Sequence, residues 1–367
     1  MKEKKKIRVP AVCVILFCMI LGFSACGGSN LSEEELSVND NATITLHGLG
    51  DEDIQVSVSE LKELKSVTKK AEATRSNGQV VSVKATGPLL ETLLEKYGVQ
   101  KEDFNTIRFY AGDGYSIAMP STIIENDDII IAYYDGGAPI GDEDGPVRVV
   151  VPGQRAMYWV RMLTQIDFES EASAVTPSSL VFLDAALPQL SAESIKVGEQ
   201  DVSAVKTQDL ISAFADIDDN TIYNVYMTAS DGLSKNETRA NFMKEYIRVS
   251  GDGAPEFTGP ALPEGMTVKG MVTLHYGDTA FLSLSQYAEM EKMTEGEKLL
   301  FSDVIKKIGT MTSDTYRFID KDGNSSQYAF DELSGASLTY SSSGVSFDPG
   351  NGKDGVISNL LKIEAVS

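Results

Sequence analysis

The stretch DGPVRVVVPGQRAMYWVRMLTQIDF, residues 144–168, decides the fold of the first part of this chain. Residues 147–151 are all valine except Arg148, and a Gly-Pro pair precedes them and a Pro-Gly pair follows them. A short β-branched run bounded by glycine and proline predicts a buried strand. Residues 158–168 predict a further strand that closes the same unit.

Upstream of this stretch, predicted strands alternate with short amphipathic helices. Ser59 opens a helix directly after an alternating strand, and Gly87-Pro88 opens a second helix that ends at Gly98. The predicted strands cover residues 43–48, 54–58, 79–85, 106–111 and 128–134. This order predicts an α+β fold that is rich in strands.

The order of elements resembles one family, the molybdopterin-binding oxidoreductase domain of the sulfite-oxidase type. The matching pieces are VSVSELKELK, TGPLLETLLEKYGV, IRFYAGDGYSIAMP, DDIIIAYYDGGAPI and the stretch at 144–168. The most specific match is a Gly-Pro-hydrophobic-Arg-hydrophobic-hydrophobic-hydrophobic-Pro-Gly run with a basic residue near the final strand. Here these positions are Gly145, Pro146, Arg148, Pro152, Gly153 and Arg161. The resemblance covers residues 43–169.

The resemblance implies a molybdenum ion held by a pyranopterin and by one protein cysteine, which falls in the interval 66–84. That interval contains no cysteine, because the chain has only Cys13, Cys18 and Cys26. A thiolate is a soft, charged ligand that serine and asparagine do not replace well. We therefore expect no catalytic residue and no metal ligand of the usual kind, and the cofactor stays unknown, with molybdopterin implied only by the resemblance.

Four residues are candidates for binding a cofactor or another anionic or flat ligand. Arg148, Arg155 and Arg161 offer positive charge, and Arg155 follows a Pro-Gly turn on a predicted loop. Trp159, the only tryptophan, offers a flat ring for stacking. Each has a structural alternative: Arg148 and Arg161 facing solvent or a carboxylate, and Trp159 packing in the core.

The sequence also predicts repeated modules. Residues 44–65 and 272–293 both give a Thr-Leu-His strand, a glycine turn, an alternating strand and a helix. FNTIRFYAGDGYS (104–116) pairs with DTYRFIDKDGNSS (314–326) in the same order. We predict two or three sulfite-oxidase-like modules in tandem, the first being the most complete. The expected organisation is a module at 43–169, a linker at 170–193, a partial or degenerate module at 194–271 and a shortened copy at 272–367.

The N-terminus predicts export and lipidation. Five basic residues in 1–8 precede an apolar run of about 16 residues, short for a bilayer span of about 20. Small residues then precede Cys26, which resembles the lipobox of bacterial lipoproteins. We expect a signal peptide at 1–25, lipid on Cys26, a flexible acidic tether at 26–42, and a protein on the outer face of the cell membrane. An uncleaved signal anchor is the alternative.

Charge restricts the partners. The chain has 32 basic and 54 acidic residues, a net charge of −22, and removal of residues 1–25 leaves −26. Nucleic acid is not an expected partner, because phosphate contacts need clustered Lys and Arg. Three functions remain open: a non-catalytic module for a small anionic or flat ligand or a surface protein, an oxidoreductase with a molybdopterin or another cofactor, and a structural spacer.

Overall fold

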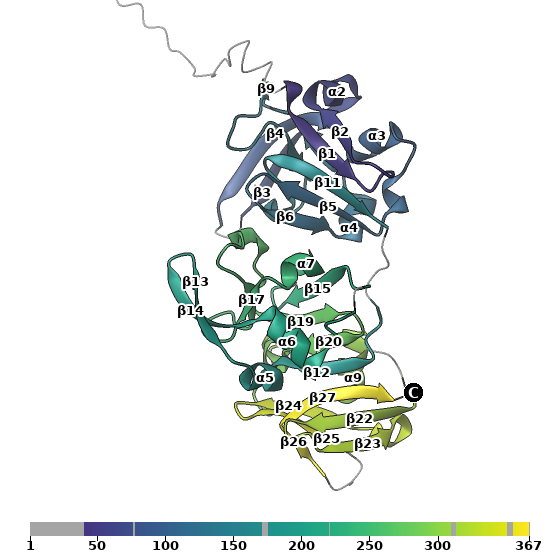
Figure 1. The fold of residues 1–367 in the computed structure, drawn as a ribbon, viewed down its shortest axis with the longest axis vertical. Coiled ribbons are helices and arrows are strands. Elements are labelled where there is room, and N and C mark those ends of the chain that lie inside the picture. Colours follow the sequence, from purple (N-terminus) through teal and green to yellow (C-terminus); the bar gives the residue numbers. More distant parts are fainter. Residues whose placement is uncertain are drawn as a thin grey trace, which may run out of the picture.

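The computed structural model describes residues 40–75, 78–170, 175–219, 221–309, 313–350 and 355–366. The predicted signal peptide, Cys26 and residues 26–39 of the predicted tether lie outside these ranges. Figure 1 shows the described chain as units stacked in a row, with residues 40–170 at one end and the C-terminal strands at the other. Within the described ranges, none of the helices has the length and apolar character needed to cross a membrane.

The first unit, residues 43–169, is built around a five-stranded sheet with the order β2-β1-β11-β5-β6. β1 runs parallel to β11, and the other neighbours are antiparallel. The strands of this sheet are β1 (Thr43–His47), β2 (Ile54–Ser57), β5 (Thr106–Ala111), β6 (Ser116–Met119) and β11 (Leu163–Glu169). The smaller sheets use β3 (Ser66–Thr74), β4 (Val80–Pro88), β8 (Tyr134–Asp135) and β9 (Ala138–Pro139), and the pair β7 (Ile130–Ala132) and β10 (Arg148–Val150). The helices are α2 (Val58–Glu63), α3 (Leu90–Glu95), η1 (Lys101–Asp103), α4 (Ser121–Asn126) and η2 (Ala156–Tyr158).

The local sequence explains most of these boundaries. Ser57 caps α2 through a capping box with Glu60, which satisfies backbone amides at the start of the helix. The helix expected to start at Gly87-Pro88 begins later, at Leu90, because Gly87 and Pro88 extend β4. A Cβ atom on Gly87 would lie 2.0 Å from the carbonyl oxygen of Ile131, so the close approach of two backbones requires glycine there.

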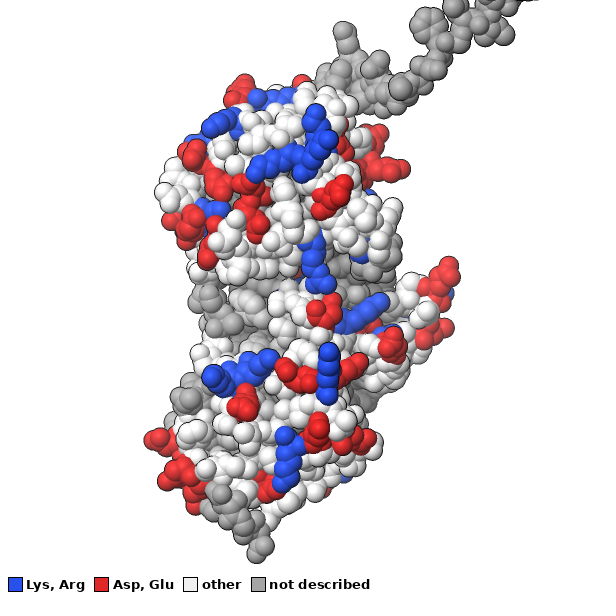
Figure 2. Space-filling view, turned by 180° about the vertical axis from the view of Figure 1, so that it is seen from behind, with Lys and Arg blue, Asp and Glu red and all other residues white. Residues whose placement is uncertain are grey.

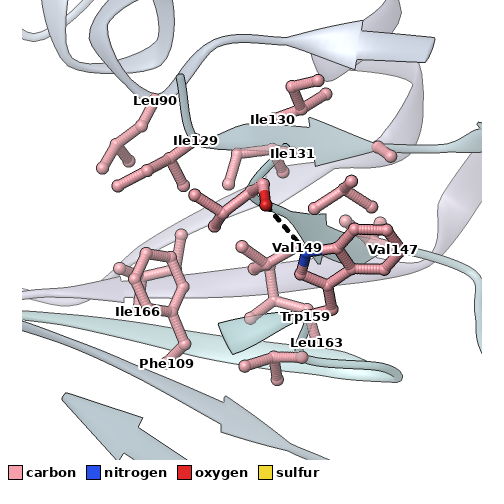
Figure 3. Close-up of a cluster of buried hydrophobic side chains, with 14 of the residues drawn as sticks. Leu90, Phe109, Ile129, Ile130, Ile131, Val147, Val149, Trp159, Leu163 and Ile166 are labelled. Carbon is pink, nitrogen blue, oxygen red and sulfur yellow. Dashed lines mark hydrogen bonds between the residues drawn. The ribbon is translucent and has the colours of Figure 1, made fainter. Parts of the chain in front are cut away.

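The valine-rich stretch that decides the fold forms the centre of the first core. Val147, Val149 and Ile131 are fully or almost fully buried and pack with Phe109 and Trp159 (Figure 3). Burying such side chains stabilises the fold by about 1.5–3 kcal/mol each. The predicted buried strand at 147–151 is therefore confirmed as β10 with its flanking residues.

The rest of the chain shares an eight-stranded sheet with the order β16-β15-β19-β20-β12-β27-β22-β23. Its strands are β12 (Ser179–Phe182), β15 (Asn224–Ala229), β16 (Ser234–Thr238), β19 (Met271–Tyr276), β20 (Thr279–Leu282), β22 (Thr315–Asp320), β23 (Ser325–Ala329) and β27 (Leu360–Val366). Two four-stranded sheets flank it: β13 (Glu193–Val197), β14 (Gln200–Lys206), β17 (Tyr246–Arg248) and β18 (Glu256–Thr258), and β21 (Lys298–Leu300), β24 (Ser337–Ser341), β25 (Gly344–Asp348) and β26 (Ile357–Ser358). The helices are α5 (Leu183–Ala186), η3 (Leu187–Gln189), α6 (Thr207–Phe214), α7 (Arg239–Phe242), η4 (Glu264–Met266), α8 (Leu284–Met290), α9 (Phe301–Ile308) and η5 (Phe330–Leu333).

Two cores lie on opposite faces of this sheet. The central core includes Phe242 and Phe257, whose rings stack at 5.6 Å. The C-terminal core includes Phe318 and Phe347, whose rings stack at 3.9 Å. Successive residues of β12 alternate between them, with Val181 in the central core.

The predicted linker at 170–193 is wrong. β12 lies inside the sheet, parallel to β20 and antiparallel to β27, and all four of its residues are buried. Pro177 precedes this strand and Pro188 lies in η3 after α5, so the two prolines flank buried elements of the fold and not a connection. The predicted boundary at 271/272 also falls inside a strand: β19 pairs with β15, and its Leu274 packs in the central core.

Three hairpins share one arrangement of turn and closing strand. The closing strands β11, β19 and β27 each follow a residue with positive φ, at Met162 (45°), Gly270 (59°) and Asn359 (54°). The carbonyl of that residue accepts a hydrogen bond of 2.8–2.9 Å from an amide of the hairpin turn. The three turns each contain an Asp-Gly dipeptide, and their glycines, Gly114, Gly232 and Gly323, have φ values of 84–88°, as glycine in a tight turn allows. The predicted repeat stays a prediction that this shared geometry supports.

Candidate functional site

The structure brings two of the four candidate residues together. Arg148 and Arg161 both donate to Asp144, at 2.6 Å to Oδ2 and 3.3 Å to Oδ1. Arg148 is buried, and burial lowers the pKa of its guanidinium, while Asp144 acts in the opposite direction. Its Nε has no hydrogen-bond partner among the described residues. Asp144 therefore already neutralises part of the charge that the two arginines would offer to an anion.

The other two candidates lie elsewhere. Arg155 is half-exposed and pairs with Asp231 across the boundary of the first unit, at 3.4 Å. Trp159 is buried, and its Nε1 donates to the carbonyl of Val151 at 2.8 Å. The indole ring therefore has a packing role, and the alternative of stacking on a ligand is wrong for this structure (Figure 3).

The glycine of the Gly-Pro pair leaves no space for a ligand. A Cβ atom on Gly145 would lie 2.7 Å from the carbonyl oxygen of Ile140 and 2.9 Å from that of Gly141. The space beside Gly145 is thus filled by the backbone of the protein itself. The close packing of the chain explains this glycine without a bound group.

The residues present do not fit a molybdenum ion on a pyranopterin. The interval 66–84, where the family places its cysteine, forms the β3–β4 hairpin, and its sequence has no thiol. Among the residues that the structure describes, no group of three or more His, Cys, Asp or Glu side chains is placed to hold a metal ion. The described residues therefore lack the thiolate that the resemblance implies for the metal.

The residue that sequence reasoning missed is Arg108 in β5. It has no exposed surface, and its side chain reaches from the first unit to β15 and β16 of the eight-stranded sheet. Its Nη1 donates to the carbonyl of Asn236 and its Nη2 to the side-chain oxygens of Asn224 and Asn236, each at 2.9 Å. Its Nε donates to Glu169 at 3.2 Å. An arginine in the middle of an otherwise apolar strand was the available signal, because a buried guanidinium needs several acceptors.

Lys235 lies next to this interface, and its burial leads us to expect that the stability of the folded protein depends on pH. It is buried, forms an ion pair with Glu237 at 3.4 Å and donates to the carbonyl of Met266. Burial lowers the pKa of Lys235 to about 8, against an unfolded value of about 10.4. Because the folded-state pKa is the lower one, the unfolded state binds the extra proton between pH 8 and about 10.4. The contribution of Lys235 to stability should therefore rise with pH across this window and stay level, at its lowest value, below pH 8.

This prediction is checked by nuclear magnetic resonance of the lysine side chains. The Lys235 Cε signal, assigned through the Lys235→Arg variant, is expected to titrate near pH 8. A Lys235 midpoint above pH 10 would contradict the prediction.

The surface carries charges of both signs. Figure 2 shows Lys and Arg side chains interspersed with Asp and Glu over most of one face, with a group of adjoining basic side chains near the top of the view. Of the exposed candidates, Arg155 and Arg161 are each paired with an aspartate. These two arginines therefore form isolated ion pairs instead of a basic stripe for a polyanion.

Comparison with known proteins agrees with the fold of the first unit. Residues 33–176 match the family described as the oxidoreductase molybdopterin binding domain. Among solved structures, the crystal structure of the sulfane dehydrogenase SoxCD from Paracoccus pantotrophus matches at 12% sequence identity and a TM-score of 0.33. That match covers 60% of this chain and 66% of that chain, just under two thirds of its length. No curated protein matches this chain. The family match confirms the predicted α+β fold of the sulfite-oxidase molybdopterin-domain type.

Proposed function

We propose that this protein is a membrane-anchored extracytoplasmic lipoprotein whose molybdopterin-type domain binds a ligand or a partner without molybdenum chemistry. The observation that carries the proposal is the combination of a retained fold with a lost ligand set. The domain has no thiol, and Asp144 holds both Arg148 and Arg161. A site that keeps its frame and loses the metal ligand is suited to binding rather than to oxo transfer.

The candidate contacts for a ligand are the accessible arginines. The side chains of Arg155 and Arg161 are 56% and 42% exposed, and each has a single carboxylate partner at 3.3–3.4 Å. Such surface pairs contribute about 0–1 kcal/mol and exchange readily for another carboxylate or phosphate. An acidic small molecule or an acidic surface of another protein is the ligand class that suits them.

The rival function is a molybdopterin-dependent oxidoreductase. The match of residues 33–176 to the molybdopterin binding domain favours it, and so does the unpartnered Nε of Arg148. A structural spacer of stacked modules is the third possibility. The proposed binding domain and the rival oxidoreductase differ in one measurable quantity, the amount of molybdenum cofactor that the purified protein retains.

The first test measures that cofactor. Residues 28–367 would be exported as a folded protein from a host that makes molybdenum cofactor, beside a sulfite-oxidase-type enzyme that serves as the positive control. We expect molybdenum well below one atom per chain by elemental analysis, and no pterin released on denaturation by mass spectrometry. Molybdenum or pterin at one per chain would overturn the proposal, because a ligand other than cysteine would then hold the cofactor.

The second test concerns the anchor. In the full chain, we expect the Cys26→Ser variant to leave the membrane fraction and to appear in soluble form, because the lipid is attached to that thiol. Metabolic labelling with a fatty-acid analogue is expected to mark the natural chain and not the variant. The Cys18→Ser chain is the matched control and should stay labelled and membrane-bound. Equal labelling of the natural and the Cys26→Ser chains would contradict the anchor.

A further inference from the structure

A hollow lies in the C-terminal half of the described chain, away from the first unit. It is an open groove of about 830 Å³ between the end of α6 and the outer face of β12, β27 and β22. Its walls include Phe214, Asp216, Asp278, Arg317, Lys362 and Glu364. Its volume is in the range of small-ligand and peptide sites, about 300–1,000 Å³. This groove is separate from the site of the proposed function.

Arg317 in this groove occupies the same place in its hairpin as Arg108 does in the first unit. Ala111 and Asp320 each precede the turn, and their amides donate to the carbonyls of Tyr115 and Asn324 at 2.8 and 3.0 Å. Both residues also lie at the register shift opposite the closing strand. Counting back three residues from each gives Arg108 and Arg317, and the neighbours of each arginine pack in a core. Both side chains therefore point away from the core of their own unit.

The two arginines differ in what covers them. Arg108 has no exposed side-chain surface, because the strands β15 and β16 lie over it. The Arg317 side chain is 40% exposed, and its described hydrogen bonds stay within its own sheet. Its Nη1 donates to Glu364 at 3.4 Å, and its Nε and Nη2 donate to the side-chain oxygen of Gln327 at 3.0 Å. In the first unit, β15 and β16 cover the sheet face around Arg108. The corresponding face around Arg317 in β22 is open.

The contacts of Arg108 indicate what such a face binds. Its acceptors beyond the first unit are one backbone carbonyl and two side-chain amide oxygens, all from adjacent strands. In the groove, the carboxylates of Asp216, Asp278 and Glu364 outnumber the cations Arg317 and Lys362 by one. This balance disfavours an anion and favours neutral oxygens, while Phe214 offers contact for an apolar side chain.

We propose that the groove is a docking site for an extended polypeptide segment of a partner protein, which presents a backbone carbonyl and Asn or Gln side-chain oxygens to Arg317. The segment lies along β27, with its apolar side chains toward Phe214. Charge-assisted hydrogen bonds of this kind contribute about 1.5–3 kcal/mol each when water is excluded. The site is independent of the anchor and of cofactor content.

The probe is a blocked synthetic peptide with the sequence of residues 224–238, the hairpin that covers Arg108. A fluorescent copy would be titrated with the soluble form without the anchor, residues 28–367, and anisotropy would be measured. We expect saturable binding to the natural chain, weakened about tenfold or more by Arg317→Met, because the amide oxygens lose their charged donor. A second peptide with leucine at both asparagine positions is expected to bind about tenfold more weakly to the natural chain.

Lys298→Met is the matched control, because Lys298 is 63% exposed and ion-paired but lies outside the groove. It is expected to bind the peptide as the natural chain does. Absence of saturable binding up to about 1 mM, which corresponds to about −4 kcal/mol, would overturn the proposal. So would equal binding by the natural chain and a folded Arg317→Met variant. Neither result depends on whether molybdenum is present.

Discussion

Replacement of Arg108 by methionine is expected to lower the free energy of unfolding of the first unit by about 3–5 kcal/mol. Arg108 is fully buried, and its loss leaves the carboxylate of Glu169 buried without its cation. It also leaves the carbonyl and amide oxygens of Asn224 and Asn236 without their donor. Methionine keeps the unbranched apolar part of the side chain, so the effect reports the loss of the guanidinium group and of its polar contacts.

Denaturant unfolding followed by the fluorescence of Trp159 measures this effect, because the only tryptophan lies in the core of the first unit. The matched control is Arg317→Met, the equivalent hairpin position with an exposed side chain, where a change within about 0.5 kcal/mol is expected. The double variant with Glu169→Gln should be less destabilised than the sum of the two single variants, because it removes the buried charge together with its partner. A loss below 1 kcal/mol in Arg108→Met would show that the interface does not depend on this residue.

Replacement of Phe318 by alanine is expected to cost about 3–5 kcal/mol in the C-terminal core. Phe318 has no exposed surface and contacts Phe347, Phe301 and Tyr328, with ring centroids at 3.9, 5.5 and 5.7 Å. Its removal therefore takes away a stacked aromatic pair and leaves a cavity in one step. Calorimetric unfolding would show a transition at lower temperature.

Phe330→Ala is the control for this prediction, because Phe330 is 49% exposed and its ring centroid lies 6.1 Å from that of Tyr316. A change within about 0.5 kcal/mol is expected there. Trp159 fluorescence should report the first unit unchanged in Phe318→Ala. Equal effects of the two phenylalanine substitutions would contradict the assignment of Phe318 to the centre of the core.

The fold type of the first unit and most of its elements were predictable from the sequence. The valine run around Arg148, bounded by glycine and proline, specifies a buried strand through local composition alone. The Asp-Gly dipeptides at 113–114, 231–232 and 322–323 each specify a turn, since their glycines adopt a positive φ that other residues rarely adopt. These predictions depend only on residues that are adjacent in the chain, so they can be made without knowledge of the tertiary structure.

The place of β12 inside the eight-stranded sheet was not predictable in this way. Ser179–Phe182 reads as a short apolar segment between prolines, and its partners β20 and β27 lie about 100 and 180 residues further along. A four-residue strand that is buried on both faces has no alternating pattern to identify it. Only pairing across the sheet gives it a role.

The sequence by itself determined that the first unit has a molybdopterin-type α+β frame and no thiol to hold molybdenum. Both properties follow from residue types and their order. The tertiary structure decided which charges are available. It placed Arg148 and Arg161 on one aspartate, Trp159 in the core, and Arg108 under strands more than 110 residues away. The charge and exposure of a side chain depend on partners that are distant in the chain, and only folding brings these partners together.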